Sequence, residues 1–182
     1  IIAGMFQERG LFPSERMAGI LASAIVSDTV MFKSPTSTER DRIIAERMAR
    51  IAGVSLKELG REIFSSSRES RSISELLHSD FKEFHIAGHS FAVAQITSVD
   101  TTELFDRRGE FLAEMAAEAK RKSYDMLLMM LTDVLLDGTW LLFVGDEEAI
   151  QNAFSIQPRE GAVFLPHVMS RKKQIIPSLS AL

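Results

Sequence analysis

The chain has 182 residues, 46% hydrophobic and 25% charged, with a formal net charge of −4 and no cysteine. This composition is typical of a globular protein with a real core, and it excludes a disordered chain or a collagen-like fibre. The lack of cysteine excludes disulfides and thiolate metal sites and fits a reducing compartment, so we expect a cytoplasmic protein. The negative charge argues against a general nucleic-acid binder, and any phosphate site must be a local basic cluster.

Residues 1–64 are predicted to be entirely helical. The signals are apolar residues at helical spacing, a Pro-Ser start, and capping boxes of the form S/T-x-x-D/E. They predict helices over residues 1–9, 14–28, 39–52 and 56–64. The second of these has no charged residue from Met17 to Val26, so we expect it to be buried on several sides.

A polar stretch over residues 65–72 contains no apolar residue and is the best candidate for a linker. We therefore predict two domains, residues 1–64 and residues 73–182. The longest apolar run, residues 126–136, is interrupted by Asp133 and is too short to span a bilayer, so no membrane partner is expected.

Residues 73–182 are predicted to alternate between strands and helices. Alternating and continuous apolar runs predict strands, and turn residues such as Asp137-Gly138 separate them. The expected strands cover residues 81–86, 90–96, 124–134, 139–144 and 162–168, and the expected helices 73–78, 101–122 and 147–154. The nearly continuous apolar strands predict an α/β fold with a sheet that is covered on both faces.

Asp28 lies at the predicted end of a buried helix, where the negative end of the helix dipole disfavours a carboxylate by about 0.3–1 kcal/mol. One interpretation is that Ser27-Asp28-Thr29 is only a polar helix stop. The other is that Asp28 binds a divalent metal ion, which would reverse that penalty. The segment by itself favours the first interpretation.

Three consecutive basic residues, Arg171-Lys172-Lys173, stand in a stretch without any acidic residue from Gly161 to Leu182. A basic triplet near a terminus is usually a solvated tail. Here apolar residues flank it closely on both sides, which would hold it in ordered structure, where arginine and lysine bind phosphate oxygens. Lys82 lies within a predicted strand and, taken by itself, would be an ordinary solvent-facing residue. The four histidines do not form a metal-binding pattern, and we expect them at the surface.

Three segments together resemble the family II, manganese-dependent inorganic pyrophosphatases of the DHH phosphoesterase superfamily. They are Ala24-Ile25-Val26-Ser27-Asp28-Thr29-Val30-Met31-Phe32-Lys33-Ser34-Pro35-Thr36, Asp80-Phe81-Lys82-Glu83-Phe84 and Ser170-Arg171-Lys172-Lys173-Gln174. The resemblance extends along essentially the whole chain. The resemblance favours a metal ligand over a polar helix stop for Asp28. It likewise favours a phosphate-binding residue over a solvated tail for Arg171.

The resemblance implies a two-domain hydrolase that splits pyrophosphate with two metal ions, manganese or cobalt, with magnesium as a further option. Asp28 would be a metal ligand, and Lys82, Arg171 and Lys172 would bind pyrophosphate oxygens. Residues 1–64 would be the last helices of a parallel-sheet DHH domain. Residues 73–182 would be the complete substrate-binding domain, with a mixed sheet flanked by helices. The family also suggests a homodimer in the complete protein.

The other metal-binding motifs of that family are absent, and the chain begins with Ile1 rather than methionine. We therefore expect a fragment of a longer enzyme, inactive by itself, that supplies the substrate-clamping domain and one metal ligand. On the sequence, Arg171→Ala should weaken pyrophosphate binding more than Lys173→Ala. Two alternatives stay open: another DHH phosphoesterase, such as an exopolyphosphatase or a nucleotide phosphodiesterase, and a non-catalytic anion-binding module.

Overall fold

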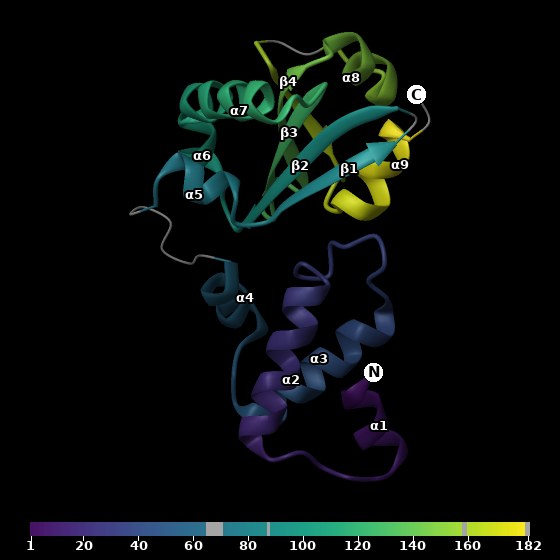
Figure 1. Cartoon of the computed structure of the whole chain (residues 1–182). Coiled ribbons are helices and arrows are strands. Elements are labelled where there is room, and N and C mark those ends of the chain that lie inside the picture. Colours follow the sequence, from purple (N-terminus) through teal and green to yellow (C-terminus); the bar gives the residue numbers. More distant parts are fainter. Residues whose placement is uncertain (65–70, 87, 158–159, 181–182) are drawn as a thin grey trace. The chain divides into compact units, whose positions relative to one another are not determined.

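A computed structural model describes residues 1–64, 71–86, 88–157 and 160–180 (Figure 1). The chain divides into two compact units, Ile1–Ser66, here called unit 1, and Ser67–Leu182, called unit 2. Most of the predicted linker over residues 65–72 lies outside the described residues. None of the described helices has both the length and the apolar character needed to cross a membrane.

Unit 1 consists of four helices, and local capping explains where they begin. They are α1 (Ile2–Glu8), α2 (Glu15–Asp28), α3 (Glu39–Ala52) and α4 (Leu56–Phe64). The hydroxyl of Ser14 accepts a hydrogen bond from the backbone N–H of Met17 and starts α2. Thr38 and Asp41 form a reciprocal capping box at the start of α3, and Gly53 ends that helix in the left-handed conformation. All four helices were predicted from the sequence.

The core of unit 1 is small and one-sided. Its main cluster of buried residues consists of Ala3, Ala18, Leu21, Ala22, Ile44, Met48 and Ala49. We expected α2 to be buried on several sides, and this expectation is wrong for the structure: Met17 is 42% exposed and Ile20 57% exposed. Among the described residues of unit 1, α2 packs on α3 and α4, and the stripe that carries Met17 and Ile20 stays exposed.

Unit 2 contains a five-stranded mixed sheet with the spatial order β1-β2-β3-β4-β5. The strands are β1 (Phe81–Ile86), β2 (His89–Ser98), β3 (Met126–Asp133), β4 (Gly138–Gly145) and β5 (Ala162–Pro166). Only the β2–β3 pair is parallel; the other three pairs are antiparallel. The predicted hairpins, β1–β2 and β3–β4, are confirmed.

Helices cover both faces of this sheet, as the apolar strands predicted. One face packs on α5 (Ile73–Leu77), α6 (Thr102–Asp106) and α7 (Arg108–Lys122). The other face packs on α8 (Glu147–Phe154), on a π-helix, η1 (Arg171–Ile175), and on α9 (Ile176–Leu179). Every residue of β3 is buried, so β3 lies at the centre of the three layers (Figure 1).

Two predictions for unit 2 need correction. The helix expected over residues 101–122 is broken at Arg107, which separates α6 from α7. The hydroxyl of Thr101 does not cap α6, because it donates to the buried carboxylate of Asp133 at 2.9 Å, and Asp100 accepts from the backbone N–H of Thr102 instead. The basic residues that could have formed a solvated tail are folded into η1.

Candidate functional site

The basic triplet forms the first three residues of the π-helix η1. Ser170 precedes it, and its hydroxyl accepts a hydrogen bond from the backbone N–H of Lys173. Ile175, at the other end of η1, is fully buried in the core on this sheet face. Because π-helical turns are rare and frequently occur at functional sites, the conformation of η1 indicates a candidate functional segment.

Three polar side chains hold the backbone just before η1. The amide of Gln95, on β2, donates to the carbonyl of Met169 at 3.3 Å, and the hydroxyl of Thr139, on β4, donates to the carbonyl of Val168. Gln174 accepts from the backbone N–H groups of Met169 and Ser170, both at 2.9 Å. These bonds satisfy backbone groups that would otherwise be unpaired, and they fix the path of the segment that carries the basic residues.

Arg171 is anchored to the sheet. Its side chain is 7% exposed, and Nη1 donates to the carbonyls of Asp80 at 2.8 Å and Val93 at 2.9 Å. Nη2 donates to the carboxylate of Asp80 at 2.7 Å. An arginine has five N–H donors. The donor on Nε and the second donor on Nη2 have no acceptor within the ranges that the structure describes.

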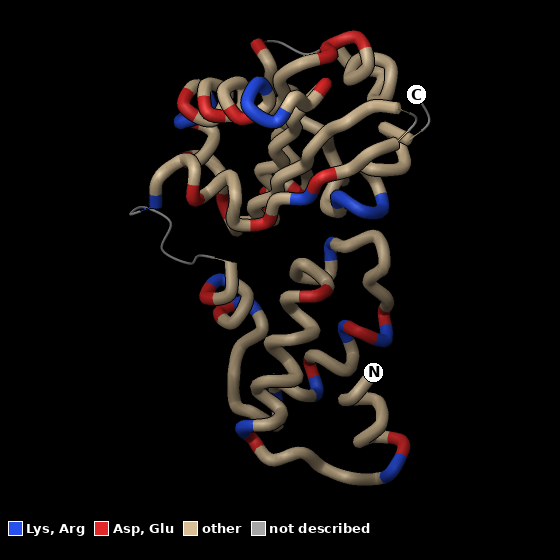
Figure 2. The backbone as a smooth tube through the Cα atoms, viewed as in Figure 1, with Lys and Arg blue, Asp and Glu red and all other residues tan. Residues whose placement is uncertain are grey.

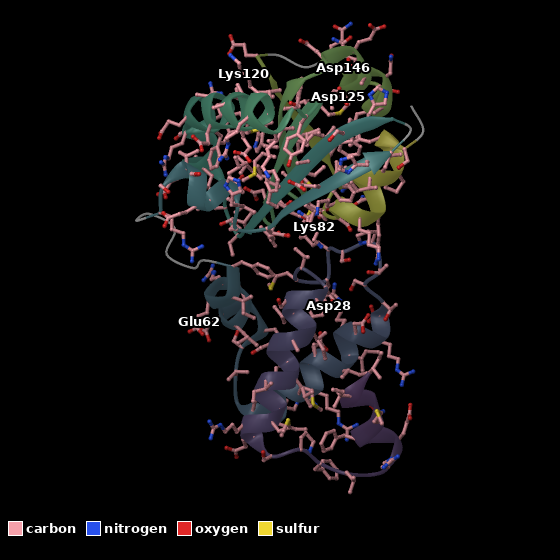
Figure 3. The ribbon with its side chains drawn as sticks, in the orientation of Figure 1. Asp28, Glu62, Lys82, Lys120, Asp125 and Asp146 are labelled. Atoms are coloured by element: carbon pink, nitrogen blue, oxygen red, sulfur yellow. The ribbon has the colours of Figure 1, made fainter. Side chains whose placement is uncertain are left out.

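Lys82, Lys172 and Lys173 are exposed and make no ion pair with any described residue. Lys82 lies on β1 opposite Val93 of β2, so the two side chains share the sheet face that η1 covers. Figure 2 shows the η1 segment as a continuous basic stretch at this face, and Figure 3 labels Lys82 on β1. The structure therefore brings Lys82 and the triplet to one face of unit 2.

The acidic neighbour of Lys82 faces the other way. Glu83 points to the opposite sheet face, where it accepts a hydrogen bond from the hydroxyl of Tyr124 and pairs with Lys122 at 3.7 Å. The hydrogen bond from Tyr124 lowers the pKa of Glu83, so its carboxylate stays ionised without neutralising Lys82. Asp80 pairs with Arg171, so the three exposed lysines leave the described part of the η1 face with a net positive charge. Such a charge suits a ligand with several anionic oxygens.

Asp28 is the last residue of α2, in unit 1, and its side chain is exposed (Figure 3). A left-handed turn follows at once, with φ values of 49°, 54° and 67° at Val30, Met31 and Phe32. Left-handed backbone costs about 1–2 kcal/mol per residue outside glycine. Such strain concentrates at functional sites.

Two contacts hold this strained turn in place. The buried hydroxyl of Thr29 donates to the carbonyl of Ile25 at 2.7 Å and accepts from the backbone N–H of Phe32 at 3.2 Å. The side chain of Met31 fills the space beside Gly60, where a Cβ atom would lie 1.9 Å from its sulfur. The turn that follows Asp28 is therefore fixed by α2 and α4 together.

A metal site is not formed by the described residues. They contain no group of three or more His, Asp or Glu side chains that could hold a metal ion. The four histidines are exposed, as expected. Asp28 could contribute one carboxylate to a metal ion, but the described residues do not form a site for two metal ions.

The sequence reasoning missed the groups that fix the basic residues in place: Asp80, Gln95, Thr139 and the carbonyl of Val93. Asp80 lies two residues before Lys82, in a segment that resembles the family, but the sequence does not show that its carboxylate holds a basic side chain. Its pairing with Arg171 spans 91 positions along the chain and leaves no local signal.

Comparison with known proteins identifies the family of this chain. Residues 63–182 match the DHHA2 domain family. A manganese-dependent inorganic pyrophosphatase from Methanothrix thermoacetophila is 37% identical over 100% of this chain, which spans 60% of that protein. A cobalt-dependent inorganic pyrophosphatase from Clostridium perfringens is 37% identical over 99% of the chain, which spans 33% of that protein.

A solved structure is also similar. A Methanococcus jannaschii protein described as a family II inorganic pyrophosphatase aligns with 93% of this chain at a TM-score of 0.81 and 35% identity, and the match covers 56% of that protein. The chain thus spans between one third and about 60% of the length of these relatives. From the family match over residues 63–182, the chain belongs to the DHHA2 domain family, and its relatives along the whole length are manganese- or cobalt-dependent inorganic pyrophosphatases.

Proposed function

We propose that unit 2 binds inorganic pyrophosphate at the η1 face, and that the chain acts in the hydrolysis of pyrophosphate to phosphate. The observation that carries this proposal is the convergence of Lys82 and the Arg171–Lys173 triplet on one sheet face, with Arg171 anchored and the lysines exposed. The relatives that match the full chain are named as enzymes of that reaction.

The residues of the chain would act on the anionic oxygens. Arg171 offers two N–H donors without a described acceptor, and a planar guanidinium can present two such donors to one phosphate. Lys82 and Lys172 would act as point charges that neutralise the phosphoryl oxygens and stabilise the charge that develops on a leaving phosphate. Lys173 is next to them in sequence and serves as the natural comparison.

Unit 1 has a separate part in this proposal. We infer that residues 1–64 are the last helices of a DHH domain, and that Asp28 supplies one carboxylate to a manganese or cobalt ion in the complete enzyme. The exposed position of Asp28 at the end of α2 and the strained turn after it support this role. Since Asp28 is a single ligand, we expect this chain by itself to bind pyrophosphate but not to turn it over.

The test is calorimetric titration of the 182-residue chain with pyrophosphate. Charge-assisted hydrogen bonds contribute about 1.5–3 kcal/mol each, so Lys172→Ala should weaken binding by roughly tenfold to a hundredfold. Lys173→Ala, with the same loss of charge, should weaken binding by about twofold. Equal losses for the two variants would mean that the triplet acts only through its overall charge, and absence of binding to the unmodified chain would refute the proposal.

A further inference from the structure

Asp80 has an unusual position for an acidic residue. It stands immediately before β1, and its side chain is half exposed. Its carboxylate accepts from Nη2 of Arg171 at 2.7 Å, and its carbonyl accepts from Nη1 of the same arginine at 2.8 Å. An acid beside a proposed anion site is unfavourable for binding through simple charge, so its presence there requires a reason.

Asp80 also links the two basic positions of the site. Its carbonyl accepts from the backbone N–H of Gln95 at 3.0 Å and thereby continues the β1–β2 pairing beyond Phe81. Lys82 follows two residues later, and side chains two apart on a strand share one face. The carbonyl of Val93, opposite Lys82, accepts from Nη1 of Arg171 as well. One residue thus fastens Arg171 to the strand that carries Lys82.

The carboxylate makes a bond that the carbonyls cannot replace. The two carbonyls hold only Nη1, about which the guanidinium plane could still tilt. The bond from Nη2 to the carboxylate is a second point of attachment and fixes that plane. With the plane fixed, Nε and the second N–H of Nη2 keep one direction, which a bidentate contact to phosphate needs.

We propose that Asp80 is a positioning residue: its carboxylate orients Arg171 so that the remaining donors of the guanidinium meet a phosphoryl group in register with Lys82. The inference rests on the proposed function and deepens it. It also predicts a sign opposite to that of simple charge. Removing a negative charge beside an anion site should strengthen binding if only the overall field matters, and should weaken it if orientation matters.

The experiment measures pyrophosphate binding to the 182-residue chain by calorimetry. Asp80→Asn should weaken binding by about tenfold, roughly the loss of one charge-assisted hydrogen bond from the oriented Arg171. Asp80→Glu keeps the charge but moves the carboxylate, and it should also weaken binding. The matched control is Glu83→Gln, the same charge change three residues later, within β1 and on the opposite face, which should leave binding unchanged or slightly stronger.

The outcomes separate the two proposals. If the unmodified chain binds pyrophosphate and Asp80→Asn binds it equally or more tightly, the positioning role is wrong and the proposed function stands. If the unmodified chain does not bind, the function itself fails. Should Asp80→Asn unfold, as judged by the fluorescence of Trp140, Asp80→Glu decides the question: unchanged affinity contradicts the positioning role, and a loss of several-fold supports it.

Discussion

The two units of this chain differ in how well their apolar surfaces are covered. In unit 2, helices cover both faces of the sheet, and only Leu135 and Leu136 are exposed among its large described hydrophobic residues. In unit 1, nine such side chains are exposed: Ile1, Ile2, Met5, Leu11, Phe12, Met17, Ile20, Ile43 and Val54. The basic face belongs to the unit with the closed core, where packed elements can hold charged side chains in fixed positions.

The largest effect is expected from the substitution of a glycine in unit 2. Gly145 has a φ of +104°, and a Cβ atom there would lie 2.2 Å from the carbonyl oxygen of Asp125. Gly145→Ala combines a strained backbone with a clash against backbone atoms, so we expect it to destabilise unit 2 by about 3–5 kcal/mol. Denaturant unfolding followed by the fluorescence of Trp140, the single tryptophan, measures this loss.

The control for that substitution lies in the same unit. A Cβ atom on Gly109, near the start of α7, would meet no atom within 4 Å outside its own helix backbone. Gly109→Ala should therefore be neutral or stabilising by up to about 1 kcal/mol. Similar losses for the two variants would show that unit 2 is not packed as described.

The next effect is a shift in the ionisation of Tyr124, the single tyrosine. Burial, and then the hydrogen bond to Glu83, raise its pKa to about 12. Since the unfolded pKa is about 10, this interaction stabilises the fold fully below that pH and is lost as the pH rises through about 12. Near pH 11 the folded chain should show about a tenth of the phenolate absorbance at full ionisation, against about nine-tenths in denaturant.

Glu83→Gln sharpens this measurement. The pKa of Tyr124 should fall but stay above 10, because burial is the larger cause of the shift and is unchanged. Half ionisation near pH 10 in the folded, unmodified chain would contradict the covered environment of this sheet face.

A smaller effect is expected in unit 1, at the turn after Asp28. Thr29→Val keeps the shape of the side chain but removes the acceptor for the backbone N–H of Phe32. The cost should be about 1–2 kcal/mol, the penalty for an unpaired buried donor. Far-UV circular dichroism should report the loss for the helices of unit 1, while the fluorescence of Trp140 stays unchanged. The control is Ser27→Ala, at an exposed position in the last turn of α2, which should cost less than about 0.5 kcal/mol.

The smallest change in stability is expected at the uncovered side of α2. Ile20 is 57% exposed, so Ile20→Ser should change the stability by less than about 0.5 kcal/mol while reducing the binding of a hydrophobic dye. Leu21 is 8% exposed, and Leu21→Ser should cost several kcal/mol, roughly as other core truncations do. Equal costs at these two neighbouring positions would mean that the exposed side of α2 is covered in solution.

Local signals explain what the sequence could predict. The capping boxes at Thr38 and Ser72 place α3 and α5 because each box lies within one turn of helix. The β1–β2 and β3–β4 hairpins follow from alternating or continuous apolar residues beside a turn. Lys172 belongs to a basic triplet between apolar residues, which is also a local signal. Lys82 was named only because its segment resembles the family, since by itself it is an ordinary strand residue.

Distant contacts explain what the sequence could not predict. Arg171 was expected to bind pyrophosphate oxygens, but no local signal indicated that it is also buried and bonded to groups 78 and 91 positions away. The break at Arg107 is another such case: beside it, Phe105 stacks on Trp140 of β4 with ring centroids 4.0 Å apart. The exposure of α2 also depends on which elements are present to cover it, and an apolar helix pattern does not record that.

The most direct test of the central claim is an amide NMR titration of the isotope-labelled 182-residue chain with pyrophosphate. We predict saturable shifts at Lys82 and at residues 170–174, small shifts elsewhere in unit 2, and none in unit 1. Shifts of equal size in both units, or no shifts at the η1 face, would contradict the claim that unit 2 carries an ordered pyrophosphate site of its own.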